Sequence, residues 1–478
     1  MRRFELAGYA LLIAITAIRI GSTWRVFSQT IDEPVSLLAG YLWLSGKPSI
    51  NPEHPPLPRI LEAFPLWRAG VQDGEESDLR ARINRMLLFR GRYVHNLALI
   101  RSGNLVYVVL ALVAVALWAR RELEPPFALL ATALFASLPP VLAHGGLATT
   151  DMAACATFAV AVVALHRWLD APSLANAILL GAAVGLGLVS KFSFIPFFGA
   201  AAVAILLLRL RRPPHYAQVI AGVATAVAIV LLIYRGDWHT FVDGIRVVGG
   251  HAREGHLAYL FGQRSQFGWW YYFPIALFFK TPLPFLALAS LGFRRRHLDA
   301  TAAAALILLI AMTTSINIGV RHILPIFPPL AILAGAGAQW LWQRRREAVV
   351  MLCAWMFVGA VFAHPDYIPW FNELALGHGE RILADSNFDW GQDVLRLRSI
   401  CRQRQIDSLA FAVFTGAPLD ELGLPPRRRI IPDVPTAGWH AISETVLTAA
   451  GGENAYAYVT RHPMVCRAGK TIRLYYVK

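Results

Sequence analysis

The sequence predicts an α-helical polytopic membrane protein with about eleven transmembrane helices and a small C-terminal α/β domain on the extracytoplasmic side. Composition is the first reason, because 56% of the 478 residues are hydrophobic and only 16% are charged, whereas soluble domains carry about 25% charge. The second reason is a series of apolar runs, several of them about 20 residues long, which is enough to cross about 30 Å of hydrocarbon. The third reason is a change near residue 364, after which charges become frequent and apolar runs become short.

Eleven apolar segments are expected to cross the membrane. Their approximate ranges are 4–24, 102–119, 126–143, 151–168, 174–190, 193–210, 216–234, 271–292, 299–316, 321–342 and 347–363. The first segment lacks a small-residue cleavage site and is long enough to span, so we expect a retained helix rather than a signal peptide.

Basic clusters on short loops set the orientation, because Lys and Arg resist translocation. Six clusters agree on one cytoplasmic side: Arg2–Arg3, Arg120–Arg121, His166–Arg167, Arg209 with Arg211 and Arg212, Arg294–Arg296 and Arg344–Arg346. Residues 25–101, 235–270 and 364–478 then lie outside. We therefore expect a transmembrane module, 1–363, with outer loops 25–101 and 235–270, and an extracytoplasmic α/β domain, 364–478.

Two outer segments have periodic patterns. Apolar residues recur at helical spacing among arginines between 79 and 97, which predicts an amphipathic helix on the outer interface. That helix could be a basic face over lipid headgroups, or one arginine could hold a lipid-linked phosphate. In the C-terminal domain, the patterns predict a helix at 393–405 and strands at 380–384, 409–414, 455–459 and 471–477.

The cysteines and the net charge give further expectations about disulfide bonds and binding partners. Cys155 and Cys353 fall inside apolar spans and are most simply packing residues. Cys401 and Cys466 lie in the tail and could pair there if the tail is outside the cytoplasm. The net charge of +15 reflects the cytoplasmic loops and attraction to a membrane surface, so no nucleic-acid partner is expected.

Ionisable and polar side chains that could take part in a reaction gather on the predicted outer face. Ionisable groups at membrane depth are costly and usually face a cavity or a partner. A carboxylate can accept a proton from a nucleophile, and Arg or Lys can hold a phosphate as charge develops on it. The candidates are Asp32, Glu33, Glu53, His54, Arg59, His144, Asp151, Lys191, Lys280, Asn317, Arg321 and His322.

Some of these residues also have a structural interpretation. Asp32, Glu33 or Asp151 could cap the start of a helix. Lys191 could extend its ammonium to the headgroups. Lys280 lies nearer the middle of its span, so we expect it to face the protein interior, where it could pair with an acid or a phosphate.

Six local patterns follow one another along the chain. They are Asp32-Glu33, Glu53-His54-Pro55-Pro56-Leu57-Pro58-Arg59, Thr150-Asp151, Lys280-Thr281-Pro282-Leu283-Pro284, Gly319-Val320-Arg321-His322-Ile323-Leu324-Pro325 and Asp385-Ser386-Asn387-Phe388-Asp389-Trp390-Gly391-Gln392-Asp393. In this order and on one predicted face, they resemble the GT-C membrane glycosyltransferases of the protein O-mannosyltransferase and aminoarabinose-transferase type, often called glycosyltransferase family 39.

The resemblance implies that a sugar is transferred from a polyprenyl-phosphate carrier to an acceptor hydroxyl, outside a bacterial inner membrane, by one inverting displacement. It implies that Asp32 is the general base, that Glu33 supports it, and that Asp151 orients the acceptor or the base. The residues that would hold the carrier phosphate are Lys280, Arg321, His322 and Arg59. The resemblance gives no individual role to Glu53, His54, His144, Lys191 and Asn317.

The sequence says less about the identity of a cofactor and of the acceptor. No organic cofactor is expected, whereas Mg²⁺ or Mn²⁺ could be held by Asp32, Glu33 and Asp151 through oxygen ligands. The lectin-like insert of eukaryotic protein O-mannosyltransferases has no counterpart here, so the acceptor could be a protein, a lipid or a polysaccharide. Membrane lipids are expected neighbours.

Two other classes of function fit part of the pattern. A transporter or flippase for a lipid-linked anion would also use many spans and interior cations, but such proteins often have internal repeats with paired broken helices, and no repeat is evident. A scaffold or receptor would not need acids clustered in the first outer loop.

Overall fold

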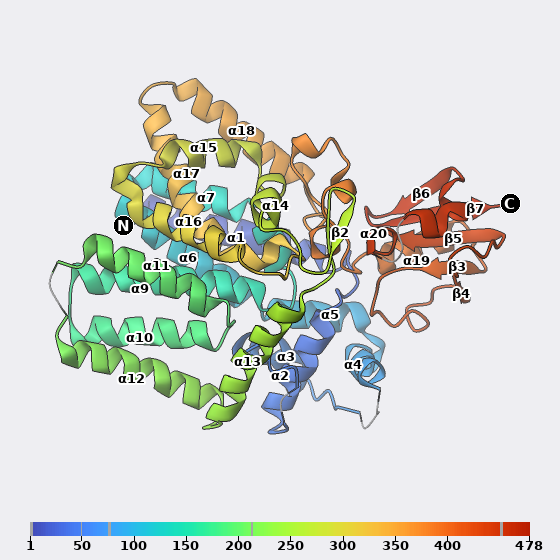
Figure 1. Ribbon diagram of the computed structural model, residues 1–478, viewed down its shortest axis with the longest axis horizontal. Helices are drawn as coiled ribbons and strands as arrows, with labels where there is room; N and C mark the ends of the chain where they lie inside the picture. Colours follow the sequence, from blue (N-terminus) through green and yellow to red (C-terminus); the bar gives the residue numbers. More distant parts are fainter. Residues whose placement is uncertain (1–2, 49, 75–77, 212–213, 450–452) are drawn as a thin grey trace.

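The structure, a computed structural model, describes residues 3–48, 50–74, 78–211, 214–449 and 453–478. A large helical bundle occupies one end and a small sheet occupies the other (Figure 1). The N-terminal helix begins at the far end of the bundle, and the chain ends in the sheet. Arg2 and Arg212, which belong to the predicted cytoplasmic clusters, lie outside the described residues.

The bundle consists of thirteen helices among the described residues. They are α1 (Arg3–Thr23), α6 (Leu105–Glu122), α7 (Pro125–Ala136), α8 (Pro139–Gly145), α9 (Asp151–Asp170), α10 (Leu174–Leu188), α11 (Phe194–Arg209), α12 (Tyr216–Ile233), α14 (Tyr272–Lys280), α15 (Leu283–Gly292), α16 (Leu298–Ala311), α17 (Phe327–Trp342) and α18 (Arg346–Phe362). Every predicted span contains at least one of them, which confirms the α-helical membrane class.

Five helical stretches among the described residues are long and apolar enough to cross a membrane, or up to seven if each of two bent pairs is one span. The five are Phe4–Thr23, Tyr93–Glu122, Asp151–Asp170, Tyr216–Ile233 and Val320–Trp342. The other predicted spans form shorter apolar helices or bent pairs.

Prolines explain the bent pairs. Helices α7 and α8 meet at 61°, and α14 and α15 meet at 114°. Each second helix begins at a proline-containing turn, where the missing N–H and the restricted preceding residue interrupt a helix. The predicted span at 271–292 is therefore two helices at a sharp angle.

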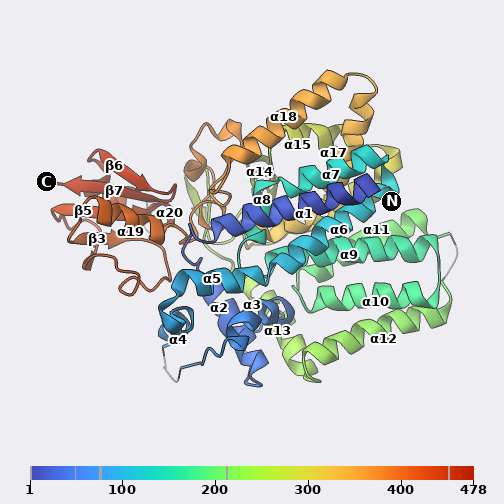
Figure 2. The same ribbon diagram turned by 180° about the vertical axis from the view of Figure 1, so that it is seen from behind.

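The three predicted outer segments lie at the same end of the bundle, which supports a common side for them (Figures 1 and 2). They contain α2 (Glu33–Leu44), α3 (Pro56–Arg68), α4 (Leu79–Leu87), α5 (Tyr93–Ser102), α13 (Trp238–Glu254), and the short strands β1 (Ala258–Leu260) and β2 (Gln263–Ser265). Basic clusters gather at the opposite end, where Arg120 pairs with Glu5 and Arg121 pairs with Asp170.

The amphipathic segment predicted at 79–97 is helical but interrupted. Helices α4 and α5 are separated by a short 3-10 turn in which Arg90 has a φ of 56°. Ile83, Met86 and Leu97 are buried against other parts of the protein, including the C-terminal domain. The interface-lying interpretation is therefore corrected, because the apolar face of this segment is covered by protein.

The C-terminal domain has a five-stranded sheet with the order β4-β3-β5-β7-β6. Its strands are β3 (Leu409–Ala412), β4 (Arg427–Arg429), β5 (Gly438–Ser443), β6 (Met464–Ala468) and β7 (Ile472–Val477), and its helices are α19 (Val394–Gln403), α20 (Glu444–Ala449) and α21 (Ala457–Thr460). Strand β3 is parallel to β4 and β5, whereas β7 is antiparallel to β5 and β6. Cys401 and Cys466 are not paired.

Two strand predictions in this domain are wrong. Residues 380–384 form part of a 3-10 turn and a single bridge from Leu383 to Leu260. Residues 455–459 form helical turns, which bury Tyr458 and Val459 against the sheet. Both segments are short, and a short apolar run does not distinguish a strand from a turn that packs on a core.

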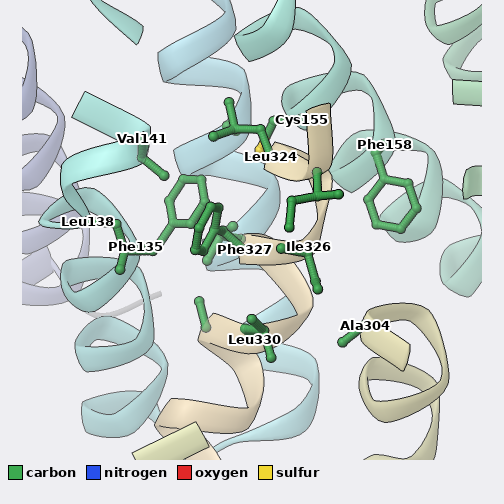
Figure 3. Close-up of a cluster of buried hydrophobic side chains, with 14 of the residues drawn as sticks. Phe135, Leu138, Val141, Cys155, Phe158, Ala304, Leu324, Ile326, Phe327 and Leu330 are labelled. Atoms are coloured by element: carbon green, nitrogen blue, oxygen red, sulfur yellow. The ribbon is translucent and has the colours of Figure 1, made fainter. Parts of the chain in front are cut away.

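Figure 3 shows part of the buried hydrophobic core of the bundle. Phe135, Phe158, Ile326 and Phe327 are completely buried or nearly so, and they join α7, α9 and α17 in one cluster. This core fixes the 3-10 turn at Val320–Ile326 against the start of α9. Each of these two segments contributes a charged side chain to the site described below.

Candidate active site

Arg321 lies at the centre of the candidate site. Its Nη1 atom is 3.0 Å from Oδ2 of Asp32 and 3.6 Å from Oδ2 of Asp151. Its Nε donates to the hydroxyl of Ser386 over 3.1 Å, and its guanidinium lies 4.3 Å from the centre of the Trp390 ring. One cation therefore joins two carboxylates from distant parts of the chain.

The backbone around Arg321 is held from the C-terminal side. The N–H of Val320 donates to Oδ1 of Asn387 over 2.9 Å, and Ser386 Oγ donates to the carbonyl of Ile318 over 2.7 Å. A Cβ at Gly319 would lie only 2.3 Å from Ser386 Oγ. Glycine is therefore required there for the 385–387 turn to approach Arg321.

Asp32 is the more accessible of the two adjacent acids. It occupies the N-cap position of α2, yet its side chain makes no capping hydrogen bond. The side chain is 39% exposed and forms an ion pair with Arg321. The capping interpretation is therefore wrong for Asp32, whose carboxylate faces the site.

Glu33 is completely buried and has a different set of partners. Its two carboxylate oxygens are 2.7 and 2.8 Å from Nε and Nη2 of Arg101, and they also accept from the N–H groups of Thr30 and Ala148. Burial alone would raise the pKa of Glu33, but Arg101 and these hydrogen bonds hold it below its ordinary value. Glu33 therefore ties the loop before α2 to α5 and to the loop before α9.

Asp151 is buried at the first position of α9, so Thr150 rather than Asp151 is the N-cap residue. One carboxylate oxygen is bound by the ammonium of Lys191, and the other accepts from Thr149 Oγ1 over 3.1 Å. With Arg321 nearby, two cations share this carboxylate. The ammonium of Lys191 is therefore turned inward and does not extend to the headgroups.

A cavity of about 300 Å³ opens beside these groups. Its walls include Glu53, His54, Lys191, Arg321 and His322. Burial, with the nearby Arg59 guanidinium, holds the pKa of His54 well below its usual range. The wall of the cavity therefore carries the cations Lys191 and Arg321 as well as the carboxylate of Glu53, and the two cations suit an anionic ligand.

Lys280 does not reach this cavity. Its buried ammonium donates to the carbonyls of Ile368 and Asn387 at 2.6 and 2.8 Å and also to that of Trp370, and it lies 4.3 Å from the centre of the Phe371 ring. These groups satisfy all three N–H donors of an ammonium. Lys280 thus fixes the segment after α18 behind the site.

Three other candidates have structural partners. Arg59 is buried and donates to the carbonyls of Ile50 and Asn51. The side-chain oxygen of Asn317 accepts from the N–H of Trp269 over 2.7 Å. His144 is buried, with its ring 6.1 Å from that of Trp390. Arg59 and Asn317 thus shape the loops near the cavity.

Sequence reasoning did not single out several residues that complete the site. Ser386 and Trp390 contact Arg321 directly, and Asp385 is a third carboxylate that acts electrostatically on Arg321 and Asp32. Asp385 has a φ of 55°, which reflects the tight turn. All three residues belong to the 385–393 pattern, but its local sequence does not show which of its side chains contact Arg321.

The acids suggested for a divalent metal do not converge. The Glu33 carboxylate is bound to Arg101, and the guanidinium of Arg321 lies between Asp32 and Asp151. Within the described part of the chain, no group of three His, Cys, Asp or Glu side chains could hold a metal ion. The residues present therefore do not fit a metal at this place.

A protein-family model matches part of this chain. Residues 93–235 match the family model described as dolichyl-phosphate-mannose-protein mannosyltransferase. Comparison with the curated proteins finds no significant match.

Among solved structures, ArnT from Cupriavidus metallidurans bound to undecaprenyl phosphate is similar, with a TM-score of 0.54 and 14% identity over 98% of this chain and 97% of that chain. The apo state of the same protein gives a TM-score of 0.50 and 15% identity over the same shares. At this identity the likeness is one of fold. With the family match, it confirms the resemblance to GT-C enzymes and the class of membrane glycosyltransferase.

Proposed function

We propose that the chain transfers a glycosyl group from a polyprenyl-phosphate-linked donor to an acceptor hydroxyl on the extracytoplasmic face of a bacterial inner membrane. The observation that carries the proposal is the pairing of the accessible Asp32 carboxylate with Arg321, which with Lys191 lines the neighbouring cavity. A base and an anion-binding group are thereby adjacent, as transfer from a phosphate-linked sugar requires.

The donor class is supported by chemistry and by likeness. ArnT, which shares the fold, has been solved with undecaprenyl phosphate. Here Arg321 and Lys191, with His322, would hold the donor phosphate in the cavity. Arg59 and Lys280 would act indirectly by holding the backbone, because their cationic groups bind carbonyls of the protein.

The reaction would be a single inverting displacement. The acceptor oxygen forms a bond to the anomeric carbon while the bond from that carbon to the phosphate oxygen breaks, and its electron pair leaves with the phosphate. Asp32 takes the proton from the acceptor hydroxyl, and Arg321 stabilises the charge that develops on the phosphate. Asp151 orients the two cations Arg321 and Lys191, because its carboxylate lies beside both of them. The acceptor would be a lipid, a protein or a polysaccharide.

The test uses the full chain in nanodiscs with a panel of radiolabelled polyprenyl-phosphate sugars. Label should leave one donor lipid for an acceptor, and Asp32→Asn should lower the rate by a factor of about 10² to 10⁴ while donor binding persists. Asp407→Asn, a change at an exposed position of the C-terminal domain, is the matched control. Movement of intact donor across the bilayer without sugar turnover would instead indicate a flippase.

The membrane face needs its own test. In cells producing Asp32→Cys, a membrane-impermeant maleimide should label position 32 from outside. Labelling only after the cytoplasm is opened would contradict the proposed face, even if the transfer activity were confirmed.

A further inference from the structure

A second, larger cavity lies away from the candidate active site, between the end of α18 and the C-terminal sheet. Its volume is about 840 Å³, and it adjoins another of about 420 Å³ with which it shares Glu380, Arg381 and Arg473. Neither cavity shares a lining residue with the cavity beside Arg321. In Figure 1 this region is where the orange end of α18 and the loops after it approach the red domain.

One side of the large cavity is cationic. Arg467 and Arg473 both bind the buried Glu444 carboxylate, so one acid serves two guanidiniums. Arg381 and Lys470 are exposed, and neither side chain forms an ion pair with an acid of the part of the chain that the structure describes. Together the two cavities are lined by five Lys or Arg side chains and three Glu side chains.

The two remaining acids do not neutralise this surface. Glu373 accepts a hydrogen bond from Nε1 of Trp355 over 2.8 Å, and buried Glu380 lies 3.4 Å from the ring of His378. Both carboxylates are therefore held by groups other than Arg381 and Lys470. The cationic side chains left over can bind an anion.

The opposite side of the cavity is apolar and continues onto the outer surface of α18. Trp355 and Val358 line the cavity and are 44% and 54% exposed, and Phe362 at the helix end is 81% exposed. Only three residues of α18 are buried, Val349, Met356 and Ala360. In a membrane, the exposed stripe would face lipid chains, because apolar side chains of a spanning helix tolerate hydrocarbon but not water.

We propose that this cavity binds an anionic phospholipid from the leaflet at this end of the bundle. Arg381 and Lys470 hold the phosphate by charge-assisted hydrogen bonds, and the acyl chains lie along the apolar stripe of α18. A free phosphate would satisfy the cations but leave the stripe uncovered, so the two halves of the cavity together match an amphiphile. This inference goes beyond glycosyl transfer and does not rest on it.

The experiment is a titration of the full chain with dioctanoyl phosphatidylglycerol, followed by native mass spectrometry, with dioctanoyl phosphatidylcholine as the zwitterionic comparison. The double variant Arg381→Gln and Lys470→Gln should weaken phosphatidylglycerol binding by about 25-fold, since each cation near an anionic headgroup contributes about a factor of five. The matched control is Arg402→Gln with Arg461→Gln, which removes the same charge from exposed positions of the same domain outside the cavity.

A second variant separates a lipid from a soluble anion. Gly359 lies in the cavity wall, and a Cβ there would meet no atom within 4 Å. Gly359→Leu should therefore fold normally and weaken phosphatidylglycerol binding by filling the apolar side of the cavity. The ability of inorganic phosphate to compete with phosphatidylglycerol for the cationic side should stay unchanged.

Three outcomes would overturn the proposal. Equal loss of affinity in the Arg402/Arg461 control would indicate unspecific charge attraction. Phosphatidylcholine binding as tightly as phosphatidylglycerol would exclude a role for the cations. If inorganic phosphate alone bound as tightly as the lipid, and Gly359→Leu had no effect, the site would be one for a soluble anion.

Discussion

The guanidinium of Arg321 lies 3.0 Å from the Asp32 carboxylate, although the two residues are 289 positions apart in the chain. The contact joins the turn before α17 to the first outer loop. Arg321 has five N–H donors, and here they serve Asp32, Ser386 and, at 3.6 Å, Asp151. A single side chain thus positions the proposed base and faces the cavity proposed for the donor phosphate.

Arg321→Lys should lower the rate of sugar transfer by a factor of about 10² to 10³, which is typical of removing one group that stabilises developing charge. Lysine keeps the charge but lacks the planar fork that binds two acceptors at once. The measurement is the transfer rate in nanodiscs. Arg246→Lys, an exposed change on α13, is the control, and an active Arg321→Lys enzyme would contradict the assigned role.

Glu33→Gln should destabilise the protein by about 3–5 kcal/mol, because it leaves Arg101 as a buried and unpaired cation. The readout is the thermal unfolding of the purified full chain. Asp32→Asn is the matched comparison at the adjacent, more exposed acid, and it should unfold close to the wild-type temperature. Equal destabilisation by the two changes would contradict the assignment of a structural role to Glu33 and a chemical role to Asp32.

Lys280→Met should also destabilise the chain, by about 3 kcal/mol, because several buried carbonyls lose their donor. Donor affinity at equilibrium should change little, since the Lys280 ammonium is fully occupied by carbonyls of the protein. Lys191→Met, in contrast, should weaken donor binding, because Lys191 lines the cavity. Binding of radiolabelled donor to both variants checks this, and a donor-binding defect in Lys280→Met at a temperature where it is folded would assign Lys280 to the phosphate after all.

Asp389 gives a pH prediction for the C-terminal domain. Burial raises its pKa to about 7, more than the N–H groups of Thr445 and Gly391 lower it. The folded state thus holds the proton more tightly than the unfolded state, in which the pKa is near 3.8. The resulting stabilisation is complete below pH 3.8 and is lost as the pH rises through about 7.

The measurement is the difference in unfolding temperature between the wild type and Asp389→Asn from pH 4 to pH 8. The wild type should lose stability relative to the variant as the pH rises, because only the wild type must ionise a buried group. Asp393, whose pKa burial raises to about 6, remains in both proteins, and its charge raises the pKa of Asp389 further in the wild type. A difference that does not vary with pH would refute the assignment.

The sequence by itself determined the class of the molecule, because composition and run length follow from the cost of placing polar groups in hydrocarbon. Its periodicity located most helices, and the chain positions of Asp32, Asp151 and Arg321 marked the site. These features are local, so they can be recognised without knowing what each segment packs against.

Only the tertiary structure decided which charged side chain faces which partner. The adjacent acids Asp32 and Glu33 look equivalent in sequence, yet Arg101 binds Glu33 and leaves Asp32 to Arg321. Likewise, Lys191 reaches the cavity while Lys280 is satisfied by carbonyls. The physical reason is that a buried charge needs a counter-charge or hydrogen bonds, and here these come from residues far away in the chain. The spacing of residues along the sequence does not show which of these distant residues come into contact.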